Sequence, residues 1–174
     1  MRLFRHSVAD GYRRLSVNAR LAGALHVLTQ VVRRTGLNHP DVNGFIDHLW
    51  RWPTVTPETF GEWEGYESPA LDAAMGDPLT PDLEAASRRA GVDPAGLRQL
   101  LASTAEIVYH GLFSVPNQAE SLGHLRTVAR VAATYGASLP PAELFAESPW
   151  SANGGWGAPM AAAEVGRWRA LTWP

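Results

Sequence analysis

The sequence predicts a single all-α domain that spans residues 1–174, built as a helical bundle or as an irregular array of about seven to nine helices. Three observations predict this fold class. Apolar residues recur at helical spacing, prolines follow residues that cap helices, and the clean period-two alternation typical of strands is missing. With 174 residues, of which 45% are hydrophobic, the chain is long enough to bury a sizeable core.

Five prolines mark the expected helix starts between residues 39 and 94. Proline is tolerated at the first helical position because its missing N–H would have no partner there, and the oxygen of a preceding Thr, Ser or Asp satisfies the next donors. Such closely spaced starts predict a run of short helices. The five pairs are His39-Pro40, Thr56-Pro57, Ser68-Pro69, Thr80-Pro81 and Asp93-Pro94.

Apolar spacing and stop signals define the individual helices. Leucines line one face of 18–35, and a glycine follows its end. Asn117 and Glu120 fit a capping box for a helix that runs to Tyr135. Residues 1–15 also show apolar residues near helical spacing and are a candidate for a loosely attached N-terminal helix. The other expected helices or helical turns are 40–52, 57–64, 69–75, 81–90, 94–112, 140–147 and 159–171.

Composition excludes several chemistries. The chain has no cysteine, which excludes disulfide scaffolds, thiolate metal sites and cysteine nucleophiles, and all 15 basic residues are arginine, which excludes a P-loop lysine and Schiff-base chemistry. A G-x-S-x-G motif is missing, and the neighbouring Asp47 and His48 would diverge by about 100° on a helix. We therefore expect a protein that is not an enzyme and that carries no cofactor.

Neither a signal peptide nor a membrane span is expected. The arginine-rich start lacks an uninterrupted apolar stretch, and the longest apolar region, 21–32, contains polar residues and is too short to cross a bilayer. We expect a cytoplasmic protein without membrane contact. The richness in alanine, arginine and proline, together with the lack of lysine, indicates a GC-rich bacterial source.

Charge is distributed unevenly along the chain. Residues 1–37 hold seven arginines and one aspartate, a balance of +6, whereas residues 38–82 hold nine acids and one arginine, a balance of −8. One interpretation is that the two regions pack side by side and neutralise each other through ion pairs that each contribute little. The other is that the acidic stretch forms a recognition surface.

The acidic stretch contains TFGEWEGYE, residues 59–67, in which glutamates are interleaved with aromatic residues. Aromatic side chains provide binding anchors, and acids steer a basic protein partner toward them. The same acids would repel phosphate, and the sequence pI of about 6.3 is too low for a typical nucleic-acid binder, so no nucleic acid is expected as a partner. The predicted partner-binding residues are Glu58, Glu62, Trp63, Glu64, Tyr66, Glu67 and Trp50.

The seven tryptophans divide by their surroundings. Trp50 and Trp168 lie in helix-like stretches and are expected in the core, whereas Trp63 and Trp156 stand among polar or glycine residues and are expected at the surface as anchors. Four of the tryptophans lie in residues 150–173, which leaves open an oligomerising helical scaffold with an interface there.

Histidines support an alternative function, a metal-dependent helical-bundle enzyme that uses His48, His110 and His124 from three predicted helices. Helical geometry weighs against it. Glu106 and His110 share a face away from the leucines and look like a solvent-side pair, and only His124 lies beside apolar residues. Neither an HExxH motif nor the acid–histidine spacing of di-metal bundles is present, so we expect no metal site.

At FIDHLWRW (45–52) and TFGEWEGYE (59–67), the chain resembles small all-helical bacterial immunity proteins of toxin–immunity pairs. The resemblance implies a protein that binds and blocks a toxin without catalysis, and it carries over to Trp50, Glu62, Trp63 and Glu64. The N-terminal arginines and the glycine-rich loop at 151–157 depart from that pattern. The leading hypothesis is therefore a non-enzymatic, immunity-type inhibitor of a basic bacterial toxin, with its oligomeric state left open.

Overall fold

The computed structural model describes residues 8–173 and confirms the all-α fold class, since it contains no β-strand in that range. A single isolated bridge joins Leu15 and Pro149. The helical elements are η1 (Val8–Arg14), α1 (Val17–Thr35), α2 (Pro40–Arg51), η2 (Trp52–Thr54), α3 (Phe60–Glu64), α4 (Pro69–Met75), α5 (Pro81–Arg89), α6 (Pro94–Tyr109), α7 (Gln118–Ala133), η3 (Ala142–Phe145), η4 (Ala152–Gly155) and α8 (Ala162–Arg169).

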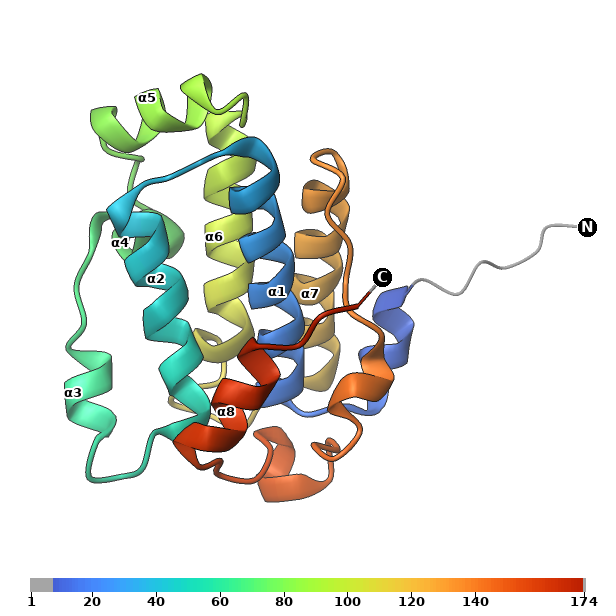
Figure 1. Cartoon of the computed structure of the whole chain (residues 1–174). Coiled ribbons are helices and arrows are strands. Elements are labelled where there is room, and N and C mark those ends of the chain that lie inside the picture. Colours follow the sequence, from blue (N-terminus) through green and yellow to red (C-terminus); the bar gives the residue numbers. More distant parts are fainter. Residues whose placement is uncertain (1–7, 174) are drawn as a thin grey trace, which may run out of the picture.

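Helix α1 lies at the centre of the fold, beside α6 and α7, with α2 on its flank (Figure 1). Other elements cover almost every face of α1, and Leu21, Leu25 and Leu28 are fully buried. His26, which the spacing places off the leucine stripe, is buried as well because the end of α8 covers that face, where its Nε2 lies 2.8 Å from the carbonyl oxygen of Trp168. The expectation that only His124 among the histidines lies beside apolar residues is therefore wrong.

Four of the five proline pairs begin helices as predicted. Pro40, Pro69, Pro81 and Pro94 open α2, α4, α5 and α6, and the preceding side chain accepts a hydrogen bond from a first-turn N–H in each case. Pro57 is the exception, because α3 begins only at Phe60. The Thr59 hydroxyl there accepts from the Thr56 backbone N–H, which forms a turn before the helix.

The predicted N-terminal helix is shorter and more firmly attached than expected. Residues 1–7 lie outside the described residues, and Val8–Arg14 form the 3-10 helix η1, which packs against α7 and η3. Tyr12 is completely buried, and its hydroxyl donates a hydrogen bond to the carbonyl oxygen of Pro140 at 3.0 Å. This burial contradicts a loose attachment of residues 8–14.

The structure also tests the predicted capping box and the membrane expectation. The Asn117 side chain accepts hydrogen bonds from the N–H groups of Ala119 and Glu120, so it caps α7 as predicted. The Glu120 carboxylate contacts His110. Across residues 8–173, none of the helices has both the length and the apolar character that a bilayer crossing requires.

Candidate functional site

Trp63 lies inside the fold, so its predicted role as a surface anchor is wrong. Its side chain is 1% exposed, and its indole N–H donates a hydrogen bond to the His48 carbonyl oxygen at 3.1 Å. The rings of His48 and Tyr109 stack on it, with centroid distances of 4.6 and 5.3 Å. Trp50, also predicted to bind a partner, is 4% exposed and packs against His26 in the core. The Trp63 indole therefore cannot contact a partner in this conformation, whereas Trp50 lines a cleft between α1, α2 and the C-terminal residues.

The glutamates around Trp63 remain at the surface. We call residues 58–67 the acidic segment; it includes α3, which lies at the outer edge of the molecule (Figure 1). Glu62 pairs with Arg51 at 2.8 Å, and both side chains are largely exposed. Among the described residues, no ion pair involves the other three glutamates, Glu58, Glu64 and Glu67, and all three are exposed.

Two local contacts shape the ends of the acidic segment. Hydrogen bonds from the Thr56 side chain and from its own backbone N–H lower the pKa of Glu58, which favours the charged carboxylate. At the other end, the half-buried ring of Tyr66 stacks on His48 with a centroid distance of 4.2 Å. Trp63 and Tyr66 therefore hold the segment against the body while its carboxylates face solvent.

An apolar groove of about 280 Å³ lies beside the acidic segment. Its wall includes the half-buried rings of Trp52, Phe60 and Trp156, and the rings of Trp52 and Trp156 pack with centroids 5.1 Å apart. Phe60 belongs both to the groove and to the acidic segment. The residues that line the groove come from η2, the start of α3, the loop after α6 and η4. These segments are far apart in the sequence, so the sequence alone did not reveal the groove. Of the two tryptophans predicted as surface anchors, Trp156 is the one that is partly exposed.

The described N-terminal arginines, those of residues 8–37, do not neutralise the acidic stretch through ion pairs. In the described part of the chain, no arginine of residues 8–37 lies within 4.0 Å of an acid of residues 38–82. Asp10 instead pairs with Arg126, and Asp47 with Arg169. Arg20 is buried in the core. These contacts favour the interpretation of the acidic stretch as a surface whose charge is available to a partner.

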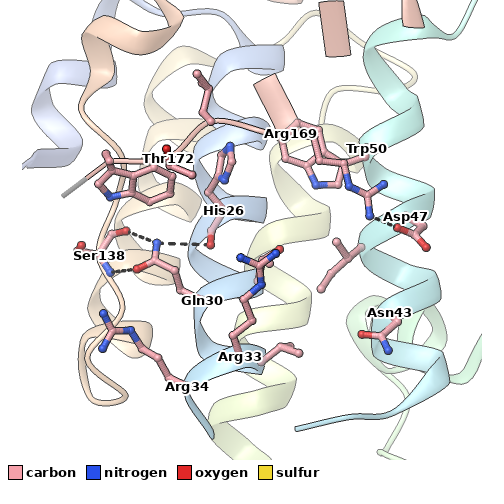
Figure 2. A pocket seen from close by; sticks show the side chains of 15 residues that line it. His26, Gln30, Arg33, Arg34, Asn43, Asp47, Trp50, Ser138, Arg169 and Thr172 are labelled. Atoms are coloured by element: carbon pink, nitrogen blue, oxygen red, sulfur yellow. Dashed lines mark hydrogen bonds and ion pairs between the residues drawn. The ribbon is translucent and has the colours of Figure 1, made fainter. Parts of the chain in front are cut away.

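A larger cleft of about 660 Å³ lies between α1, α2 and the C-terminal residues (Figure 2). Arg33, Arg34 and Arg169 line it together with one carboxylate, Asp47, which pairs with Arg169. On another wall, Gln30 donates a hydrogen bond to the carbonyl oxygen of Ser138. The excess of arginine favours an anion in this cleft over a cation. Sequence reasoning missed the cleft because its arginines come from opposite ends of the chain.

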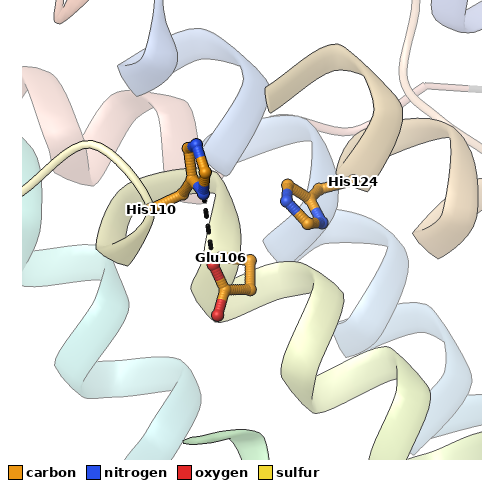
Figure 3. A group of neighbouring side chains, drawn as sticks. All are labelled: Glu106, His110 and His124. Carbon is orange, nitrogen blue, oxygen red and sulfur yellow. Dashed lines mark ion pairs between the residues drawn. The ribbon is translucent and has the colours of Figure 1, made fainter. Parts of the chain in front are cut away.

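The three histidines of the alternative hypothesis do not form one site. His48 is buried, its Nε2 lies 3.0 Å from the Tyr109 hydroxyl, and its Nδ1 has no hydrogen-bond partner among residues 8–173. His110 and His124 do meet, between α6 and α7, and the third member of their group is Glu106 (Figure 3). The proposed combination of His48 with the other two is therefore wrong, since the Trp63 and Tyr66 rings enclose His48 elsewhere.

Acidification is expected to destabilise the fold through His48. Burial, and to a smaller extent the charge of Arg51, lowers the pKa of His48 to about 4, whereas an unfolded histidine titrates near about 6.5. Between these values the unfolded chain binds the extra proton, so the free energy of unfolding falls as the pH drops, by roughly 2 kcal/mol near pH 5 relative to neutral pH.

Urea unfolding of the wild type and of H48Q, near pH 7 and near pH 5, measures this effect. The variant is expected to lose less stability on acidification than the wild type does. An equal loss in both proteins would show that His48 is not the group responsible.

Comparisons with known proteins add no family to this description. No protein-family model matches the chain, and no curated protein and no solved structure matches it significantly. The resemblance to immunity proteins therefore stays a prediction, and the residues of the acidic segment and the apolar groove carry the functional proposal.

Proposed function

We propose that this chain is a non-enzymatic binding protein, an immunity-type inhibitor that blocks a basic bacterial toxin through the acidic segment and the apolar groove beside it. The observation that carries the proposal is the exposure of Glu58, Glu64 and Glu67 without an ion pair among the described residues. Carboxylates that no internal cation neutralises keep their full attraction for arginine and lysine side chains of a partner.

The groove supports the proposal because it provides the apolar contact that the glutamates lack. Binding energy in protein interfaces is concentrated in a few well-packed apolar or aromatic contacts, with polar groups around them. Trp52, Phe60 and Trp156 offer such a contact, and Phe60 lies between Glu58 and Glu62 in the chain. In this arrangement the glutamates orient a basic partner, and an apolar side chain of that partner enters the groove.

Such a surface would inhibit by occupying the partner. A toxin that acts on an anionic substrate, such as a nuclease, needs a basic active-site surface. The acidic segment would cover that surface in place of the substrate, so inhibition requires no catalytic group on this chain. The same charge disfavours nucleic acid as a ligand of the acidic segment.

Neutralising two unpaired glutamates tests the steering role. With a partner captured from the source organism, E58Q/E64Q is expected to slow association several-fold at low salt and to flatten its salt dependence, because the long-range attraction falls with the charge. Stopped-flow fluorescence measures the association rate. The control D77N/E143Q removes the same number of exposed charges elsewhere and should associate like the wild type. Equal slowing in both variants would mean that only net charge matters.

Truncating the groove separates anchoring from steering. F60A is expected to raise the dissociation rate of the captured partner and to leave the association rate nearly unchanged, because short-range packing acts after encounter. An unchanged dissociation rate, with the fold intact by circular dichroism, would remove the groove from the proposed interface.

A further inference from the structure

Two helices present matching acid–histidine pairs to each other at one end of the molecule. Glu106 and His110 are four residues apart at the end of α6, and Glu120 and His124 are four residues apart at the start of α7. At this spacing the two side chains of each pair share a helix face. Because α6 and α7 pack as neighbours joined by a short loop, the two faces meet (Figure 3).

Three of these side chains are close enough to share one ion. Ligand atoms of Glu106, His110 and His124 all lie within 4.8 Å of one another, and the His110 Nδ1 lies 4.0 Å from the Glu106 Oε2. Ligand atoms of a tetrahedral zinc site, at about 2.0–2.2 Å from the ion, are about 3.3 Å apart. His110 follows the last residue of α6 and is 42% exposed. Its side chain therefore has room to rotate toward an ion shared with Glu106 and His124.

Glu120 acts on the other nitrogen of His110. Its carboxylate contacts Nε2, so it can accept a hydrogen bond from the Nε2–H tautomer, in which Nδ1, the nitrogen nearer Glu106, carries the free lone pair. A carboxylate that holds the non-ligating N–H of a metal-bound histidine is a common feature of metal sites, because it fixes the tautomer and raises the basicity of the ligand. Glu120 is therefore a positioning residue for His110.

The electrostatics also suit a cation. The two carboxylates supply negative charge on either side of the histidines, and no arginine pairs with Glu106 or Glu120 among the described residues.

We propose that Glu106, His110 and His124 bind a divalent transition-metal ion of the zinc class, with Glu120 positioning His110. Two imidazoles and a carboxylate are ligands that Zn²⁺ prefers, and they exclude Ca²⁺ and Mg²⁺, which prefer oxygen ligands. Three protein ligands at a half-exposed site leave one coordination position for water or for an outside ligand. The ion would link the end of α6 to the start of α7, on either side of the loop that exposes Phe113 and Val115.

Titration of tag-free, chelator-treated protein with Zn²⁺ in a calorimeter tests the site. We expect one ion per chain. E120Q is expected to weaken binding about 10–100-fold, the range for loss of a carboxylate that positions a ligand, and H124Q or E106Q to weaken it further. E84Q, which removes one carboxylate of an acid–arginine pair on α5, should bind like the wild type. Co²⁺ should give the visible absorption of a tetrahedral complex with the wild type and lose it in H124Q.

Either of two results would overturn the site. One is the lack of Zn²⁺ binding tighter than about 1 mM, the affinity of the weakest calcium-binding modules. The other is undiminished binding in H110Q and H124Q, which would place the ion elsewhere. Circular dichroism without metal separates loss of a ligand from loss of the fold. Because His110 is exposed, H110Q is expected to keep the packing intact even where H124Q disturbs it.

Discussion

Replacing Trp63 with alanine is expected to lower the free energy of unfolding by about 3–5 kcal/mol, the usual cost of removing a large buried aromatic side chain. The indole is enclosed by His48, Trp52 and Tyr109, so the cavity left behind cannot fill by a small shift of one neighbour. The His48 carbonyl oxygen also loses its hydrogen bond from the indole N–H in the protein interior.

Urea unfolding of W63A measures this loss, and W63F separates its two causes. The phenylalanine keeps part of the packing but not the N–H, so W63F should fall between the wild type and W63A. F113A is the matched control, because Phe113 is 83% exposed and its truncation should change the free energy of unfolding by no more than about 0.5 kcal/mol. A decrease of less than about 1 kcal/mol in the free energy of unfolding of W63A would contradict the burial of Trp63 in the core.

Replacing Arg20 with methionine is expected to have a comparable effect, about 3–5 kcal/mol. The guanidinium is completely buried, and its hydrogen-bond acceptors include backbone carbonyl oxygens and no carboxylate among the described residues. It donates to the carbonyl oxygens of Tyr12, Arg13 and Gln118. It also donates to the Ser121 hydroxyl and lies over the Trp150 ring at 4.5 Å from its centroid. Arg20 thus ties η1 to α1 and to the start of α7.

The loss of stability in R20M follows from the hydrogen-bond acceptors that no longer have the guanidinium as a donor. Methionine fills a similar volume, so the cavity is small, but three carbonyl oxygens and the Ser121 hydroxyl each lose the hydrogen bond from the guanidinium. The Tyr12 and Arg13 oxygens keep one other donor each, the Leu15 N–H and the Gln118 side-chain amide. Burial, and to a smaller extent the charge of Arg126, lowers the pKa of Arg20 to about 10, so the side chain is still charged at neutral pH. R130M is the control, since Arg130 is exposed and should tolerate the change within about 0.5 kcal/mol. Equal stability of R20M and R130M in urea unfolding would contradict this role of Arg20.

Local signals account for the parts of the fold that the sequence predicts correctly. A capping side chain followed by proline favours a helix start through local contacts alone, and four of the five such pairs begin helices. Pro57 fails because the Thr59 hydroxyl satisfies the Thr56 N–H in a turn instead. Arg20 is expected at the surface by its type, and only its carbonyl partners from η1 and α7 make its burial possible.

The candidate sites depend on contacts between segments that are distant in the sequence. The spacing of apolar residues along one helix does not indicate such contacts. Trp63 has polar sequence neighbours, yet α2 and α6 cover it, and the groove beside it needs Trp156 from the other end of the chain. The spacing correctly places Glu106 and His110 on one exposed face. The repeat of the same spacing at Glu120 and His124 was the available signal that a second pair would face the first.

The proposal that the acidic segment binds a basic protein is tested by capturing a partner from a lysate of the source organism. Immobilised wild type, E58Q/E64Q/E67Q and the control D77N/E143Q are compared at about 50 mM and about 500 mM salt, which changes the screening length severalfold. We expect a basic protein that is retained at low salt by the wild type and the control, released at high salt and lost from the triple variant. Equal retention of the same protein by the triple variant and the wild type would contradict it.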